Sequence, residues 1–174
     1  MSNLNRNIII VPYANDVDMC TGVNIKSEDS FNIYMKNCCV ALLSAKKYNA
    51  DSDVALVTNI EVPEPYKKIL CDNEILIIKA PFDAFKFADN YKWGLAFYKL
   101  CALKYVVENT EYDFYSYLDA DVYIQSSFSN IWRECEDNIL LYDINHGLQV
   151  ADYNKFLSEI KTFTKSDKII TVSY

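Results

Sequence analysis

Short apolar runs alternate with stretches of helical periodicity along most of this chain, and this alternation restricts the fold more than any other feature of the sequence. The apolar runs predict strands at residues 7–12, 53–58, 74–79 and 113–118. Apolar residues spaced three and four apart predict helices at residues 30–47 and 91–108, with a short helical turn at 66–70. Strands that alternate with crossover helices predict an α/β fold, a mixed and mostly parallel sheet flanked by helices.

The rest of the chain continues the same pattern. Further elements are predicted at residues 122–124 (strand extension), 128–135 (helical turn), 139–142 (strand), 152–163 (helix) and 168–173 (strand). The run at 113–118 is almost wholly apolar or aromatic, which predicts a strand in the middle of the sheet. A chain of 174 residues can bury one substantial core, so we expect a single domain over residues 1–174.

Composition and charge exclude several classes of function. The formal net charge of -7 is the opposite of what a protein needs to neutralise phosphates along a nucleic acid, so we expect no nucleic-acid partner. No apolar segment is long enough to cross a bilayer, and the default location is the cytoplasm. The six cysteines show no CxxC spacing, and we expect reduced thiols, with Cys38 and Cys101 buried on apolar helix faces.

A pair of aspartates, Asp119 and Asp121, directly follows the strand predicted at residues 113–118. Acidic residues two apart occur elsewhere in this chain too, so the position after the strand singles this pair out. Ligands of open α/β sheets bind at the carboxyl ends of strands. Two carboxylates separated only by the small Ala120 repel each other, and Mg²⁺ or Mn²⁺ would relieve that repulsion. On chemistry alone, a solvated acidic turn explains the pair equally well.

The residues around this pair resemble a known family. The run YSYLDADVYI at residues 115–124 is similar to the DxD motif of GT-A glycosyltransferases, which use nucleotide-sugar donors. The run KWGLAFYKL at residues 92–100 resembles the helix before the DxD strand in these enzymes, and the opening strand and loop resemble their nucleotide-binding start. The resemblance covers roughly residues 7–145, is to enzymes like those of glycosyltransferase family 8, and implies a Rossmann-like GT-A fold.

The resemblance also assigns residues to a donor site. It implies that Asp121 ligates the metal directly, while Asp119 contacts the ribose or reaches the metal too, with Ala120 between them. In that family the loop after the first strand cups the base and ribose, which here indicates Pro12, Tyr13, Ala14 and Asp16. Asn59, at the end of the second strand, and Lys92, at the start of the helix, are further candidates. For these loop and helix residues, an ordinary structural or solvated role is the alternative.

The implied activity is transfer of a sugar from a nucleotide diphosphate donor, a UDP-sugar first, to a glycan or other acceptor. Bound Mn²⁺ or Mg²⁺ would stabilise the negative charge that develops on the leaving diphosphate. His146, the only histidine, could serve as a third metal ligand or a general base, but it follows the motif too closely to match the family's usual late ligand. No residue is singled out as the catalytic base.

The resemblance is incomplete after the motif. GT-A enzymes normally continue into a half that binds the acceptor, whereas only residues 122–174 follow the motif here, so we expect a partial form that lacks a full acceptor region. One alternative is a non-catalytic module that binds nucleotide or metal. Another is a sugar nucleotidyltransferase, although its glycine-rich phosphate loop has no counterpart among three scattered glycines. The last alternative is a structural protein in which the acidic pair binds no ligand.

Overall fold

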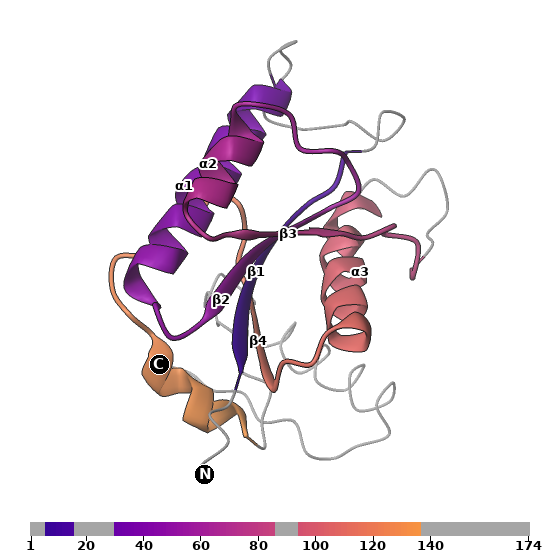
Figure 1. The fold of residues 1–174 in the computed structure, drawn as a ribbon. Coiled ribbons are helices and arrows are strands. Elements are labelled where there is room, and N and C mark those ends of the chain that lie inside the picture. The colour runs from indigo at the N-terminus through magenta and orange to yellow at the C-terminus, as the bar shows by residue number, and fades with distance from the viewer. Residues whose placement is uncertain (1–5, 16–29, 86–93, 137–174) are drawn as a thin grey trace, which may run out of the picture. The chain divides into compact units, whose positions relative to one another are not determined.

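Figure 1 shows a computed structural model of the chain, which describes residues 6–15, 30–85 and 94–136. The chain divides into two compact units, Met1–Trp132 and Arg133–Tyr174, and only residues 133–136 of the second unit are described. A single domain over residues 1–174 therefore stays a prediction. The elements in chain order are β1 (Asn7–Tyr13), α1 (Ser30–Tyr48), β2 (Asp53–Thr58), α2 (Tyr66–Asp72), β3 (Leu76–Lys79), α3 (Gly94–Asn109), β4 (Phe114–Tyr117) and the 3₁₀ helix η1 (Ser129–Cys135).

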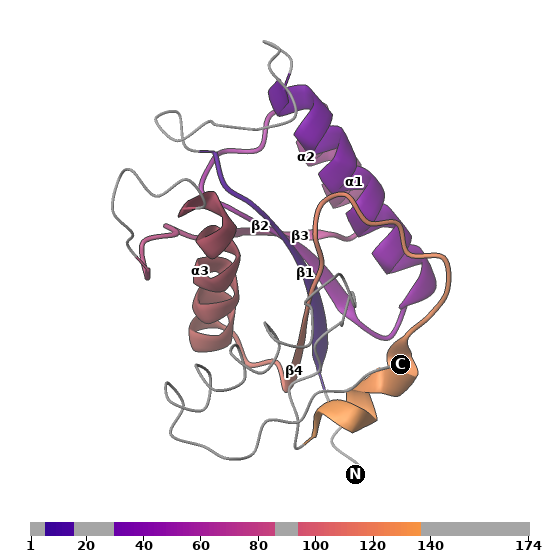
Figure 2. The same cartoon turned by 180° about the vertical axis from the view of Figure 1, so that it is seen from behind.

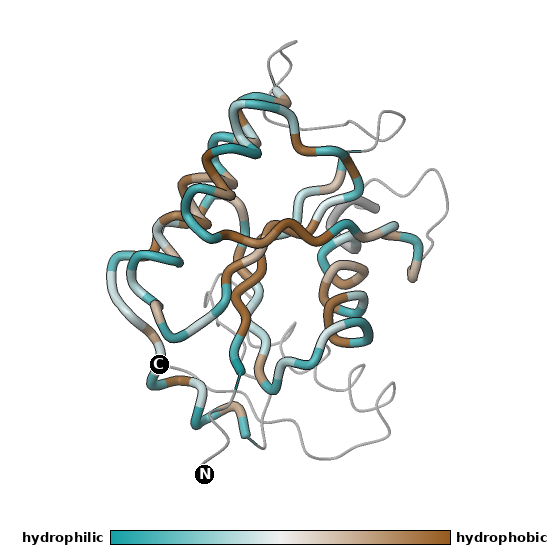
Figure 3. The backbone as a smooth tube through the Cα atoms, in the orientation of Figure 1, coloured by the Kyte–Doolittle hydropathy of each residue, from teal (hydrophilic) through white to brown (hydrophobic). Residues whose placement is uncertain are grey.

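The described strands form one sheet in the order β3-β2-β1-β4, and every neighbouring pair is parallel. β1 lies between β2 and β4, so that Ile8 pairs with Asp53 on one side and with Tyr115 on the other. The apolar runs of β1 and β2 are buried on both faces, as expected for inner parallel strands, and they form the hydrophobic centre of Figure 3. The predicted α/β architecture with a mostly parallel sheet flanked by helices is confirmed.

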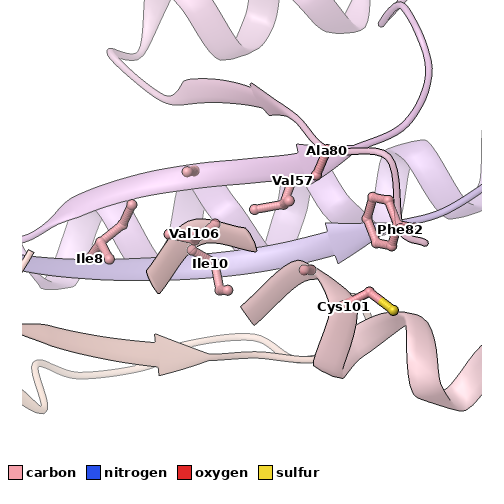
Figure 4. Packing of buried hydrophobic residues seen from close by; sticks show 9 residues of the cluster. Ile8, Ile10, Val57, Ala80, Phe82, Cys101 and Val106 are labelled. Atoms are coloured by element: carbon pink, nitrogen blue, oxygen red, sulfur yellow. The ribbon is translucent and has the colours of Figure 1, made fainter. Parts of the chain in front are cut away.

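Helices cover both faces of this sheet (Figures 1 and 2). α1 and α2 pack together on one face, and α3 covers the other. Because successive side chains of a strand point to opposite faces, β1 contributes to both cores. Ile8 and Ile10 pack with Cys101 and Val106 of α3 in the cluster of Figure 4. The buried side chains of α1, on the opposite face, include Met35, Cys38, Ala41, Leu42 and Ala45.

β4 has one neighbour among the described strands. Within the described ranges it pairs with β1 alone, and the inner place predicted for it stays a prediction, because residues 137–174 are outside those ranges. All four of its side chains are only partly buried. The polar tip of one of them has a local partner, since the hydroxyl of Tyr115 donates to the carbonyl of Tyr112 at 2.7 Å. Residues 122–124 form no strand extension.

β3 begins later than predicted because of the way α2 ends. Glu74 has a φ of 55°, in the left-handed region, and its N–H donates to the carbonyl of Cys71 at 3.1 Å. A residue in this conformation closes a helix and cannot begin an extended strand. β3 therefore starts at Leu76. The elements predicted at residues 139–142, 152–163 and 168–173 lie outside the described part of the chain.

Two buried polar residues hold the segment that follows the acidic pair. Asn49 is fully buried, and its side-chain oxygen accepts the backbone N–H of Phe128 at 3.0 Å. The hydroxyl of Ser44 accepts the backbone N–H of Ile124 at 3.0 Å. Both acceptors belong to α1 or to the turn directly after it, so residues 124–128 are tied to this helix across nearly eighty positions of sequence.

Replacing Asn49 by alanine should lower the free energy of unfolding by about 1–3 kcal/mol, because the N–H of Phe128 loses its buried acceptor. Urea unfolding followed by circular dichroism measures this change. Asn109→Ala is the control, since the exposed amide of Asn109 bonds only the carbonyl of Tyr105 one turn earlier in the same helix. Equal losses in the two variants would contradict the anchoring role of Asn49.

The cysteines of the described residues are free thiols, and Cys20 lies outside these residues. The predicted burial of Cys38 and Cys101 is confirmed, with exposed fractions of 0% and 1%. Burial, with a smaller contribution from the neighbouring Cys39, raises the pKa of Cys38 from its ordinary value of 9.0 to about 12.

Iodoacetamide at pH 8 should therefore alkylate the exposed Cys71 at least about tenfold faster than Cys38, as read by mass spectrometry of the peptides. The pKa of Cys38 is higher in the folded than in the unfolded protein. Its contribution to the free energy of unfolding is therefore complete below pH 9.0 and declines as the pH rises toward 12. Similar alkylation rates for the two cysteines in folded protein would show that Cys38 is accessible.

Candidate functional site

A pocket of about 420 Å³ is built around the carboxyl ends of β1 and β4. Its lining comes from the end of β1 with the loop that follows, from the first turns of α1, and from the end of β4 with the turn that follows. α3 and a single residue of the segment between β3 and α3 complete it. The residues that line it are Pro12, Tyr13, Ala14, Asn15, Ser30, Phe31, Tyr34, Asn37, Phe82, Tyr98, Lys99, Tyr117, Asp119, Ala120 and Asp121. Segments far apart in sequence therefore meet at one edge of the sheet.

The acidic pair lies in this pocket, directly after β4. Hydrogen bonding to β1 continues one residue past the strand, because the N–H of Leu118 donates to the carbonyl of Ile10 at 2.9 Å. The chain then turns, and Asp119, Ala120 and Asp121 all line the pocket. Asp121 is exposed, and the side chain of Asp119 is 47% exposed. The pair predicted from sequence therefore faces a cavity.

Lys99 of α3 is a pocket residue that the sequence did not single out. Its ammonium group forms an ion pair and hydrogen bond with Oδ1 of Asp119, and it lies 5.5 Å from the centre of the Tyr117 ring. The hydroxyl of Tyr117 donates to the same carboxylate oxygen. The one available signal was a lysine within the otherwise apolar run GLAFYKLCAL of α3. Helical periodicity alone does not show that this residue reaches the end of β4.

Protonation states in this cluster follow from burial and from its hydrogen bonds. Partial burial on its own would raise the pKa of Asp119, but the hydrogen bonds from Lys99 and Tyr117 and the charge of Lys99 outweigh burial and lower that pKa. Burial, together with the hydrogen bond to Asp119 and the carboxylates of Asp119 and Asp121, raises the pKa of Tyr117 far above its ordinary value. At neutral pH, Asp119 is ionised and Tyr117 is a neutral donor.

Aromatic side chains form the other prominent part of the lining. The ring of Tyr13 meets Phe31 edge to face at 5.9 Å and lies 6.4 Å from the ring of Tyr34. A second pair of lining residues, Phe82 and Tyr98, also meets edge to face, with ring centroids 5.8 Å apart. Phe31 and Tyr34 belong to the apolar stripe of α1, from which the sequence predicted this helix. That stripe extends into the first turns of the helix, where it borders the pocket.

The candidate donor-site residues have different outcomes. Pro12, Tyr13 and Ala14 line the pocket together with the acidic pair. Asn59, predicted to contact the nucleotide, is not among the lining residues. Its side chain bonds the backbone of Asn15 twice, accepting from the N–H and donating to the carbonyl, each at 3.0 Å. Asn59 thus holds the loop after β1, which is a positioning role. The remaining candidates, Asp16, Lys92 and His146, lie outside the described residues.

The acidic pair is a reasonable but incomplete donor set for a divalent cation. Its carboxylate oxygens are the ligand type that Mg²⁺ and Mn²⁺ prefer, and Mg²⁺ is often held by one or two carboxylates plus phosphate and water oxygens. In the part of the chain that the structure describes, no group of three or more His, Cys, Asp or Glu side chains could hold a metal. A cation here would bind Asp119 and Asp121 and would compete with Lys99 for Asp119.

Comparisons with known proteins do not identify a family for this chain. No family model matches this chain, and no curated protein does either. The GT-A family resemblance therefore stays a prediction. Within residues 6–15, 30–85 and 94–136, no helix has the length and apolar character needed to span a membrane.

The hydrogen bonds of Asn59 lead to a local prediction. Asn59→Ala should speed amide hydrogen exchange of Asn15 by at least about fivefold, because its N–H loses an acceptor worth roughly 1 kcal/mol. Asn59→Asp keeps that acceptor while losing the donor to the Asn15 carbonyl, so the exchange rate of Asn15 should stay closer to wild type. An unchanged rate in Asn59→Ala would mean that the loop is held by other contacts.

Proposed function

We propose that this chain carries the donor site of a metal-dependent glycosyltransferase of the GT-A type. The donor is a nucleotide diphosphate sugar, a UDP-sugar in the first instance, and the acceptor is a glycan or another hydroxyl compound. The observation that carries the proposal is the meeting of the loop after β1 with the acidic pair after β4 in one pocket. Nucleotide ligands of parallel sheets bind at this kind of position.

The strand order supports a ligand at this edge. From β1 the chain proceeds outward through β2 to β3, and it then returns past β1 to add β4 on the other side. The strand order therefore reverses at β1, and ligands of such sheets bind at the carboxyl ends of the strands beside this reversal. The pocket volume of about 420 Å³ lies within the range of small-molecule sites.

The pocket offers two kinds of chemistry that a nucleotide diphosphate needs. Tyr13, Phe31 and Tyr34 supply aromatic surface, which suits the flat base and the ribose. Asp119 and Asp121 supply the oxygen ligands through which a divalent cation grips a diphosphate. The combination of aromatic surface with a carboxylate pair favours a nucleotide ligand over a purely apolar one.

The roles of the charged residues follow from their contacts. A divalent cation, when bound, neutralises charge that develops on the leaving nucleoside diphosphate. Asp121 is the more accessible ligand, since it is exposed. Asp119 is oriented by the hydroxyl of Tyr117, which donates to Oδ1 and so restricts rotation of the carboxylate. Lys99 adds a positive charge within the same pocket.

Calorimetric titration of UDP, with and without Mn²⁺, tests the proposal. Wild-type protein should bind UDP in a Mn²⁺-dependent way, and Asp121→Asn should weaken that binding by at least about tenfold, because a ligand of the cation loses its charge. Asp72→Asn is a matched control: Asp72 is an exposed aspartate on α2, paired with Lys68, and does not line the pocket. Its affinity for UDP should equal that of wild type.

Each contrary result has a definite meaning. UDP binding that needs no Mn²⁺, or that survives Asp121→Asn, would rule out the acidic pair as the metal site. Binding of ADP or GDP in preference to UDP would change the donor base and leave the site in place. Hydrolysis of UDP-glucose in the presence of Mn²⁺ separates an enzyme from a module that only binds the donor.

A further inference from the structure

We infer that Lys99 is an internal counter-ion for Asp119 in the ligand-free protein, and that it leaves this carboxylate when a diphosphate and its divalent cation bind. The inference rests on the donor site proposed above and adds a coupling between the two parts of the ligand. Lys99 opposes binding of the cation alone and favours binding of the anion. The two ligands then assist each other, because the anion draws Lys99 away from Asp119, and the cation on Asp119 frees Lys99 for the anion.

The ammonium group of Lys99 lies beside the carboxylate oxygen of Asp119 that a divalent cation would use as a ligand. Nζ of Lys99 bonds Oδ1 of Asp119, and the hydroxyl of Tyr117 bonds the same oxygen. A divalent cation that used this carboxylate would stand close to the ammonium group. Two cations at such short range repel each other strongly, even with partial screening by water. Cation binding therefore requires Lys99 to move or to find another anion.

The charge balance of the lining supplies that other anion. Three of the described residues that line the pocket are charged: Lys99, Asp119 and Asp121. Together these three described residues carry one net negative charge, which repels an incoming diphosphate. If Lys99 turns from Asp119 to a phosphate oxygen, the anion gains a charge-assisted hydrogen bond. Asp119 is then available to the divalent cation, which offsets much of the remaining negative charge.

The ion pair is exposed enough to exchange partners easily. The side chain of Lys99 is 43% exposed and that of Asp119 is 47% exposed. Ion pairs with this access to water typically shift an equilibrium by about fivefold or less. Asp119 also keeps a donor when Lys99 leaves, since the hydroxyl of Tyr117 bonds the same carboxylate oxygen. The carboxylate can thus change its cation while its orientation is retained.

Two titrations of the Lys99→Met variant test this exchange, and they should move in opposite directions. Mn²⁺ binding without nucleotide, measured from the free-ion signal by electron paramagnetic resonance, should tighten about two- to fivefold relative to wild type, because a competing cation is gone. UDP binding without metal should weaken by about fivefold or more, because the pocket loses its positive side chain. A general loss of folding could not tighten Mn²⁺ binding.

The same helix provides a matched control. Lys104 of α3 forms an ion pair with Glu108, its side chain is 41% exposed, and it does not line the pocket. Lys104→Met should leave both affinities unchanged. In an Asp119→Asn background, Lys99→Met should alter Mn²⁺ affinity much less, because the carboxylate over which the two cations compete is absent. Lys99→Gln, which is also neutral, should reproduce the result of Lys99→Met if that variant is poorly folded.

The outcomes separate this inference from the proposed function. Unchanged or weaker Mn²⁺ binding in both Lys99→Met and Lys99→Gln would overturn the counter-ion role, even if wild type binds UDP with Mn²⁺. Tighter Mn²⁺ binding in those variants, with no UDP binding by wild type under any condition, would support the counter-ion role and refute the nucleotide site.

Discussion

The structure depends on the pairing of β1 with parallel strands on both sides. Its registers set Tyr13 opposite Thr58 of β2 and Ile10 opposite Tyr117 of β4. The chain therefore leaves β1 and β4 at the same edge of the sheet, and the loop after one lies beside the turn after the other. The cores on the two faces hold β1 in the centre, because its apolar run is buried between helices on both sides of the sheet.

Much of this arrangement could be predicted from the sequence. Apolar runs and helical spacing are local signals, and they located every described strand and helix to within a few residues. The acidic pair was also predictable, because Asp119 and Asp121 immediately follow a strand and parallel strands end at the ligand-binding edge. The order of the described strands and the pairing of β4 with β1 were not predictable. They depend on which strands pair, and an aromatic strand such as FYSY suits an inner or an outer place.

The remaining site residues could not be found because their roles come from tertiary placement. Lys99 reaches Asp119 across twenty positions of sequence, and only the crossing of α3 over the sheet brings them together. Asn59 has the side chain of a ligand contact, yet it is used to hold the backbone of Asn15. Phe31 and Tyr34 follow the periodicity of a buried helix face. They border a pocket because that face extends into the first turns of α1.

Stability and ligand chemistry are separated within this fold. Burial of β1, β2 and the helix faces supplies the folding energy, at about 25 cal/mol for each Å² of apolar surface removed from water. The charged cluster adds little, since half-exposed ion pairs contribute about 0–1 kcal/mol and adjacent carboxylates repel. Lys99, Asp119 and Asp121 can consequently change partners without disturbing the sheet that positions them. A buried parallel sheet with weakly paired charges at the carboxyl ends of its strands is suited to binding an anion together with its cation.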